Sequence, residues 1–217
     1  MRNYVKSTGC LCILLTAACA TASTVVYDNG APAFGGVNVT QVRGADDFVL
    51  SSSTTITGVR FFGDTLPTPA NFPGSFGGTL SYAFYNNSSG TPGSLISSGS
   101  SSALTGVASG SFYIVDFNLA SSVALAAGTY WLEVHEGATS STDDGSPIFW
   151  AGLNSAPASN AMLSSSLNTV PNSDLNFELA FQLFSDPATS GAPEPSTFLL
   201  FAAPLAIAAF RLRRKVT

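Results

Sequence analysis

The chain has 217 residues, of which 45% are hydrophobic and only 10% are charged, and its formal net charge is −5. A single domain with one core is the natural expectation at this length. The basic residues are concentrated at the two ends, so the long middle of the chain is acidic. Nucleic-acid binding needs Lys and Arg to neutralise phosphates, and this distribution therefore excludes a nucleic-acid partner.

The N-terminal segment, residues 1–22, has the three parts of a secretory signal peptide. Arg2 and Lys6 form a basic start, an apolar run follows, and Ala20 and Ala22 flank a small-residue cleavage site. The apolar run is too short to be a comfortable membrane span. We expect the secretion machinery to export the chain and signal peptidase to cut after Ala22.

All three cysteines, Cys10, Cys12 and Cys19, lie inside this segment. The processed chain would therefore have no disulfide, no cysteine-ligated metal and no cysteine nucleophile. Lipoprotein processing at Cys19 is an alternative, although Thr16 stands where that signal has a large aliphatic residue. A buried N-terminal helix is the other alternative.

Residues 23–185 are predicted to form an all-β domain. Short runs of β-branched and aromatic residues are separated by Gly, Ser, Asn and Pro, and no run has a helical period. Many short strands without helices predict a β-sandwich or jelly roll. The strands are expected near residues 24–27, 47–50, 55–62, 79–85, 94–97, 112–118, 129–136, 148–150 and 176–184.

The clearest alternation lies in the predicted strand 129–136. Tyr130, Leu132 and Val134 are expected on one face of this strand, whereas Trp131, Glu133 and His135 share the opposite face. Trp131 and Trp150 could together form a flat platform for a sugar ring, with core or rim packing as the alternative.

The residues that could support catalysis do not form a recognisable constellation. His135 is the only histidine and is expected to be exposed or half-buried. No Gly-x-Ser-x-Gly elbow accompanies it for a serine hydrolase, and no second histidine is present for a catalytic zinc. Glu133 and Glu136 are expected on opposite faces of one strand, which does not suit a two-carboxylate glycosidase. No catalytic residue is assigned.

Three pairs of adjacent residues have oxygen ligands of the kind that calcium prefers. They are Asp28–Asn29, Asp46–Asp47 and Asp143–Asp144, all in loop-like contexts. No Asp-x-Asp-x-Asp loop is present, and solvated turns account for adjacent acids equally well. A structural calcium ion stays open as an alternative, with no metal ligand assigned.

The C-terminal segment, residues 193–217, follows a short linker over residues 186–192 and has three parts. Pro193, Glu194 and Pro195 form an extended unit, because proline fixes φ and restricts the residue before it. Thirteen mostly apolar residues follow, which as a helix would span ~20 Å against a hydrocarbon core of ~30 Å. A basic cluster then ends the chain: Arg211, Arg213, Arg214 and Lys215. It is expected to stay in the cytoplasm, with the acidic domain outside.

This three-part tail resembles the PEP-CTERM sorting signal of Gram-negative bacteria. The resemblance implies recognition by an exosortase-type membrane transpeptidase, a transient stay in the inner membrane, and transfer to the cell surface or an extracellular polysaccharide matrix. It covers only about 25 residues. An ordinary single-span anchor that is retained for life is the alternative.

The middle of the chain has a second resemblance. Its runs at residues 48–50, 56–61, 90–93 and 125–131 look like exported bacterial jelly-roll domains, which are similar in architecture to carbohydrate-binding modules. We therefore expect a non-enzymatic surface or matrix component, with a carbohydrate-binding module as the alternative and a hydrolase or an ice-binding protein as minor ones. Fold alone does not decide among them.

Overall fold

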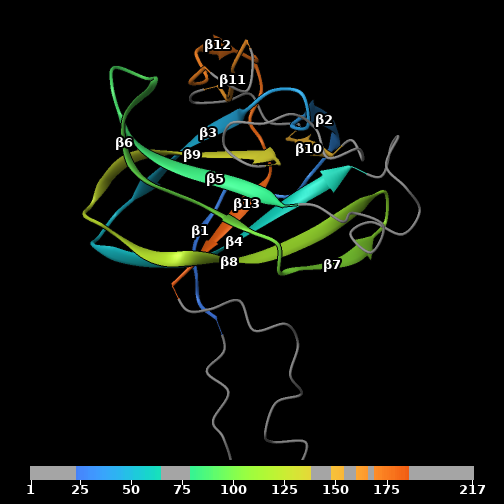
Figure 1. The fold of residues 1–217 in the computed structure, drawn as a ribbon, viewed down its shortest axis with the longest axis horizontal. Coiled ribbons are helices and arrows are strands. Elements are labelled where there is room, and N and C mark those ends of the chain that lie inside the picture. Colours follow the sequence, from blue (N-terminus) through green and yellow to red (C-terminus); the bar gives the residue numbers. More distant parts are fainter. Residues whose placement is uncertain (1–22, 65–78, 138–147, 154–159, 166–168, 186–217) are drawn as a thin grey trace, which may run out of the picture. The chain divides into compact units, whose positions relative to one another are not determined.

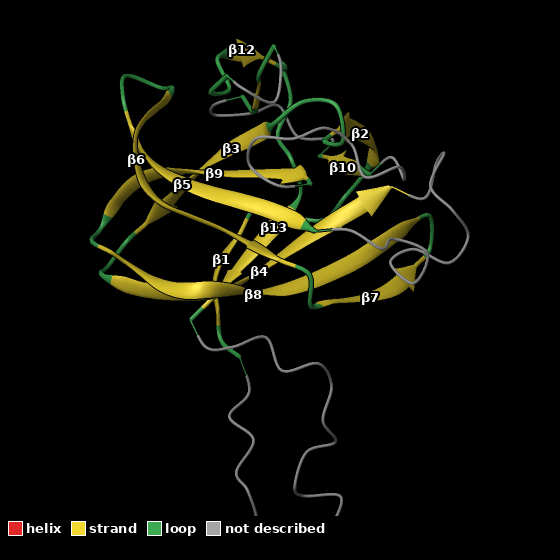
Figure 2. Cartoon of the chain, in the orientation of Figure 1, coloured by secondary structure: helices red, strands yellow, loops and turns green. Residues whose placement is uncertain are grey.

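The computed structural model describes residues 23–64, 79–137, 148–153, 160–165 and 169–185. These residues form an all-β arrangement of two antiparallel sheets, as expected from the sequence and consistent with a β-sandwich (Figure 1). The predicted signal peptide, linker and sorting segment lie outside the described residues. Within the described ranges, no helix is long and apolar enough to cross a membrane (Figure 2).

The first sheet, sheet A, is built around the long strand β4. Strands β13 and β10 pair with different parts of one side of β4, and β8 pairs with its other side. Its strands are β1 (Val25–Asp28), β2 (Phe34–Asn38), β4 (Thr54–Asp64), β7 (Leu104–Ser109), β8 (Phe112–Leu125), β10 (Phe149–Gly152) and β13 (Phe181–Phe184). Strand β7 pairs with β8 and lies at one edge.

The second sheet, sheet B, has the strand order β12-β11-β3-β9-β5-β6. Its strands are β3 (Gly44–Leu50), β5 (Leu80–Asn87), β6 (Pro92–Ser101), β9 (Gly128–Glu136), β11 (Met162–Leu163) and β12 (Ser173–Asp174). Seven consecutive cross-strand pairs join β3 to β9, and seven more join β9 to β5, without a register shift. Strand β9 is therefore held on both sides.

Aromatic side chains from both sheets meet in the core. Phe48 of β3 contacts Phe181 of β13 with ring centroids 6.4 Å apart, and Tyr82 of β5 contacts Phe117 of β8 at 5.9 Å. All four side chains are at most 2% exposed. Each buries an aromatic surface worth a few kcal/mol of transfer free energy, so these contacts stabilise the association of the two sheets.

Local chemistry accounts for the turns and close approaches. Ser89 and Gly90 both have positive φ, of 55° and 82°, and join β5 to β6 in a tight hairpin. Gly36 of β2 lies so close to β10 that an added Cβ would sit 1.4 Å from the carbonyl oxygen of Trp150. Only glycine permits that approach.

Candidate functional site

The residues assigned to processing and sorting lie outside the described part of the chain. They are Ala20, Ala22, Pro193, Glu194, Pro195, Arg211, Arg213, Arg214 and Lys215. The acidic pair Asp143–Asp144 lies outside it as well. The predicted roles of these residues stay predictions.

The two tryptophans do not form a sugar-binding platform. Trp150 is fully buried among core aromatics, and its Nε1 donates a hydrogen bond to the carbonyl oxygen of Ala180 at 2.8 Å. Trp131 is 1% exposed on the other face of sheet B, where its Nε1 donates to Oδ1 of Asn87 at 3.0 Å. Neither ring presents a face to solvent. The platform interpretation of Trp131 and Trp150 is wrong, and the packing alternative is correct.

The face of β9 that carries Glu133 is buried around an ion pair. Nε of Arg43 donates to Oε1 of Glu133 at 2.6 Å, and Nη2 of Arg43 donates to the hydroxyl of Tyr85 at 2.8 Å. That hydroxyl in turn donates to Oε2 of Glu133 at 2.8 Å. The three side chains close a ring of hydrogen bonds. The segment after β10 adds Ser164, whose Oγ accepts from the backbone N–H of Arg43 at 2.8 Å.

Burial dominates the electrostatics of this buried ion-pair cluster, which comprises Arg43, Tyr85 and Glu133. It raises the pKa of Glu133, although Arg43 lowers that pKa through its hydrogen bond and its charge. Burial likewise raises the pKa of Tyr85, with the charge of Glu133 as the next cause. Loss of either partner of such a pair is strongly destabilising, because it leaves the other charge buried alone.

His135 follows on the same face and is fully buried, so the expectation of an exposed or half-buried side chain is wrong. Its Nδ1 lies 2.8 Å from the carbonyl oxygen of Glu136, and its Nε2 has no hydrogen-bond partner in the described part of the chain. Burial lowers the pKa of His135, and the charge of Arg43 lowers it further. The neutral imidazole is therefore the favoured state.

The two glutamates of β9 have separate partners. Glu133 belongs to the buried ion-pair cluster, whereas Oε2 of Glu136 accepts a hydrogen bond from the hydroxyl of Thr40. The Thr40 hydroxyl oxygen also accepts from the backbone N–H of Ile148 at 2.7 Å. Both carboxyl groups thus contact neighbouring parts of the fold.

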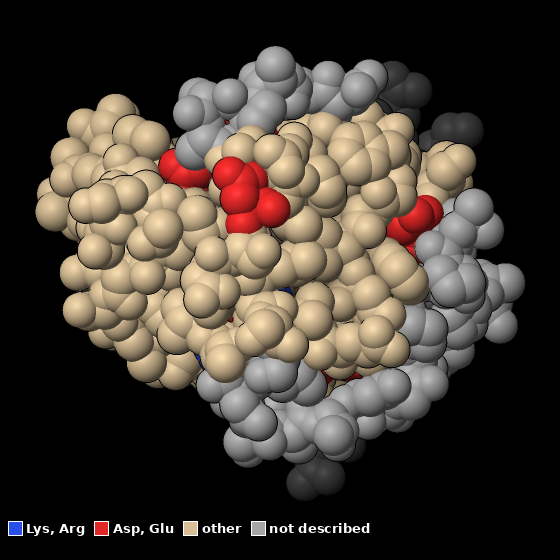
Figure 3. Space-filling model, turned by 90° about the horizontal axis from the view of Figure 1, so that it is seen from above, with Lys and Arg blue, Asp and Glu red and all other residues tan. Residues whose placement is uncertain are grey.

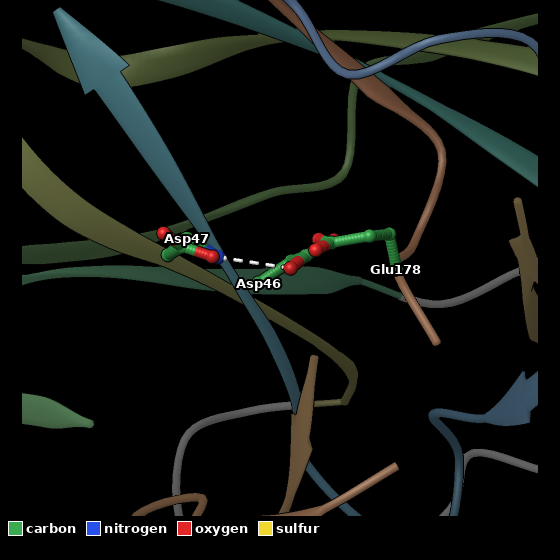
Figure 4. A group of neighbouring side chains, drawn as sticks. All are labelled: Asp46, Asp47 and Glu178. Carbon is green, nitrogen blue, oxygen red and sulfur yellow. Dashed lines mark hydrogen bonds between the residues drawn. The ribbon is translucent and has the colours of Figure 1, made fainter. Parts of the chain in front are cut away.

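A second group of acids gathers where β3 meets the segment that precedes β13. Asp46, Asp47 and Glu178 form this acidic cluster, and their carboxylate oxygens lie within 4.8 Å of one another. In Figure 4, the side chains of Asp46 and Glu178 point toward each other, and Asp47 lies on the opposite side of Asp46. Asp46 is fully buried and Glu178 is 8% exposed.

The oxygens of Asp46 are already engaged by donors. Oδ2 accepts from Nδ2 of Asn29 at 2.9 Å and from the backbone N–H of Leu179 at 2.6 Å, and Oδ1 accepts from the backbone N–H of Asp47 at 3.0 Å. A carboxylate has about four acceptor positions, so these three bonds leave room for one more contact.

Burial raises the pKa of Asp46 well above its ordinary value, and a hydrogen bond to the side chain of Glu178 raises it further. Two adjacent buried carboxyl groups are stable either when they share a proton or when a cation lies between them. Because the lone pairs of Asp46 are largely occupied by N–H donors, the arrangement favours a shared proton. The calcium interpretation of the pairs Asp46–Asp47 and Asp28–Asn29 stays a prediction.

The outer face of sheet A has a line of polar side chains across neighbouring strands. Nε and Nη2 of Arg60 donate to the two carboxylate oxygens of Asp116 at 2.6 and 2.7 Å. Nη1 of Arg60 donates to Gln182 at 3.3 Å, and Gln182 donates to Asp28 at 2.9 Å. The fork of Arg60 matches the carboxylate geometry, so this line stabilises the order of the strands.

A groove of about 380 Å³ opens beside that line. Two half-buried aromatic side chains, Phe62 and Phe112, contribute the apolar part of its wall. The polar part includes Asp28, Ser109 and Gln182, and the loop at residues 30–32 completes the described lining. This volume lies within the range of small-ligand sites, and the combination of aromatic and polar groups is typical of them.

Sequence reasoning missed these groupings for physical reasons. No short motif could link Asp46 to Glu178, because one lies in β3 and the other just before β13. Phe62 follows the core residue Phe61, so alternation within β4 could have placed it on the outer face.

No known protein family, no characterised protein and no solved structure matches the chain.

Proposed function

We propose that the protein is an exported component of a bacterial cell surface or extracellular matrix, delivered by its two terminal segments, with a β domain that acts by contact and not by catalysis. The observation that carries this proposal is the three-part tail, in which Pro193-Glu194-Pro195 precedes a short apolar run and a basic end. In this reading both terminal segments form helices in the membrane before processing, and the domain between them is a jelly roll. After processing, the domain acts without a membrane segment.

The extent of the folded part supports this division. The described strands run from Val25 to Phe184. They lie within the product expected after cleavage behind Ala22 and near the Pro-Glu-Pro unit. The non-catalytic part of the proposal is supported by the position of Glu133 and Asp46, which are buried and bonded to neighbouring groups.

Intact-mass analysis of the protein recovered from secreting cells tests the proposal. We expect a product that lacks residues 1–22 and the basic end when the sorting protease is present, and a membrane-bound product that retains Arg214 when the protease is deleted. The variant in which Pro193, Glu194 and Pro195 are all replaced by Ala should behave as in the deletion strain. A cytosolic product that still carries Arg214 would refute the proposal.

The groove of sheet A favours a second candidate function, the binding of a neutral saccharide. Aromatic faces stack on sugar rings, and carboxylate, amide and hydroxyl groups bind sugar hydroxyls. Phe62 and Phe112 provide the first kind of contact, and Asp28, Ser109 and Gln182 provide the second. This site replaces the rejected tryptophan platform.

Titration with soluble fragments of the exopolysaccharide of the producing cells tests the saccharide candidate. We expect Phe112→Ala to weaken binding by about tenfold, which corresponds to one lost stacking contact of ~1.4 kcal/mol. Phe34→Ala is the matched control, because Phe34 is an exposed aromatic residue of β2 that is not among the groove residues. Equal binding by both variants would remove this candidate.

A further inference from the structure

Strand β7 is an open edge of sheet A. It pairs with β8 from Leu104↔Phe117 to Ser109↔Phe112 without a register shift. In the described ranges no strand pairs with its other side. Figure 1 shows β7 beside β8 at the margin of the sheet. In an edge strand every second residue directs its N–H and C=O groups outward, so β7 presents a regular row of backbone donors and acceptors.

Strand β7 lacks the features by which proteins normally protect an edge. Charged side chains, proline and β-bulges are the usual ones. The sequence Leu104–Ser109 contains no charge and no proline, and its pairing with β8 is free of bulges. The chain has no charged residue anywhere between Asp64 and Asp116. Val107 is 66% exposed at the middle of this edge.

The other open edge next to it is protected. Strand β6 ends sheet B, but its pairing with β5 shifts register between Phe84 and Tyr85 and again between Tyr85 and Asn87. It also begins with Pro92. These irregularities interrupt the row of backbone groups that a further strand would need. Of the two edges, β7 is therefore the one suited to strand addition.

We propose that β7 pairs antiparallel with β7 of a second copy of this chain, so that sheet A continues across a two-fold axis. An identical strand supplies the matching row of donors and acceptors and makes each contact twice. It also brings no like charge to the interface, which would destabilise directly opposed residues. The nearest acid on the adjacent strand is Asp116, and its charge is compensated by Arg60.

The charge of the molecule favours a copy over a partner recruited by electrostatic attraction. Both described arginines, Arg43 and Arg60, are held by carboxylates. The face in Figure 3 is mostly uncharged, with acids in a few places. Backbone pairing of two neutral edges requires no opposite charge, and a second copy brings an edge of the same length and regularity.

Cysteine cross-linking tests the proposal on the full chain in mild detergent, with Cys10, Cys12 and Cys19 replaced by Ser. Thr105→Cys, Val107→Cys and Ser109→Cys each place one thiol along β7. Antiparallel pairing brings opposed Cα atoms to ~4.5–5.5 Å, which permits a disulfide. A single cysteine meets its own copy only where it lies on the two-fold axis, so Leu104→Cys, Gly106→Cys and Ala108→Cys complete the series over β7. We expect one of the six variants to give a covalent dimer on oxidation, whereas Leu95→Cys on β6 stays monomeric. The absence of a dimer from all six would overturn the proposal.

Sedimentation provides a second measurement that does not depend on the exact register. Val107→Lys should weaken dimerisation by about tenfold or more, because it places two lysines at the interface. Leu95→Lys is the matched control, since Leu95 is 56% exposed and lies on the protected edge β6. An equal effect of both substitutions, or an association that Val107→Lys leaves unchanged, would show that the copies meet elsewhere.

Discussion

The difference in unfolding free energy between Asp46→Asn and the parent should depend on pH: the substitution is unfavourable at low pH and not unfavourable at neutral pH. Asp46 is fully buried, and burial and Glu178 both raise the pKa of its carboxyl group. An acid whose pKa is raised in the folded state binds its proton more tightly there than in the unfolded chain. Its contribution to stability is therefore complete below the ordinary pKa of 3.8 and is lost as pH rises through the raised value.

The magnitude follows from the contacts. Each unit by which the pKa of Asp46 in the folded state exceeds its ordinary value corresponds to ~1.4 kcal/mol of unfolding free energy that is lost by pH 7. An asparagine retains an acceptor for Leu179 and Asn29 and gains an N–H donor toward Glu178. It loses the bond from the backbone N–H of Asp47, at a cost of ~1 kcal/mol. Asp46→Asn should therefore be less stable than the parent by ~1 kcal/mol near pH 3.5 and at least as stable at pH 7.

Urea unfolding at several pH values measures this difference. The variant must be compared with the parent at each pH, because His135 also makes stability depend on pH. Burial lowers the pKa of His135, so its contribution to stability rises with pH, whereas that of Asp46 falls. Asp174→Asn is the control, since Asp174 is an exposed residue whose pKa is lowered by hydrogen bonds from Asn160 and Asn176. It should show no gain at pH 7.

A pH-independent difference, or a loss that is largest at pH 7, would refute the shared proton. The second result would mean that an ionised Asp46 is stabilised by a cation. In that case millimolar calcium should raise the melting temperature of the parent and leave that of Asp46→Asn unchanged.

Three further changes test other parts of the fold by urea unfolding. Arg43→Met should cost ~3–5 kcal/mol because it leaves Glu133 buried without its partner, and the double variant with Glu133→Leu should recover most of that loss. Recovery of less than half would contradict the reasoning. Arg60→Lys should cost only ~0.5–1 kcal/mol, since the Arg60–Asp116 pair is partly exposed, and the cost should shrink in high salt. Gly36→Ala should cost ~3 kcal/mol or more, because its Cβ would overlap a backbone carbonyl of β10, and a well-folded variant would show that β2 can move away.

The sequence predicted the strands whose side chains alternate clearly. Strand β9 was expected over residues 129–136 and is observed at Gly128–Glu136, and the face that Leu132 and Val134 share lies in the core. The Asn, Ser and Gly residues between the strands expected near 79–85 and 94–97 form the hairpin, with Ser89 and Gly90 at its tip. These features depend on local chemistry, which a single sequence contains.

Strands β2 and β7 were not predicted because they have little side-chain signal. Strand β2 contains Gly35 and Gly36, and β7 contains Gly106 and Ala108 among few large residues. The segment 176–184 shows the opposite error. It alternates throughout, yet only Phe181–Phe184 forms a strand, because Asn176 has a φ of 59°. Register and pairing depend on neighbours distant in sequence, and local pattern does not record them.

Trp131, Glu133 and His135 share one face of β9, as the alternation predicts, but that face is buried, contrary to the exposure expected for His135 and for a platform at Trp131. Alternation determines which residues share a face, but it does not determine what covers that face. Met162 packs beside Trp131, and Ser164 bonds to Arg43, so the segment around β11 covers a surface that would otherwise be polar and exposed. Such coverage is a tertiary effect, and it explains why the expected sugar platform was wrong.

Burial also removes several acidic side chains from the surface of the domain. Five of the acids, Asp46, Asp64, Glu133, Glu136 and Glu178, are buried, so they contribute little to the field outside the molecule. A chain with a net charge of −5 thereby presents a surface with fewer charges than its composition suggests. Charge repulsion between copies is correspondingly weak, and contact with neutral polymers or with a neutral strand edge meets little electrostatic opposition.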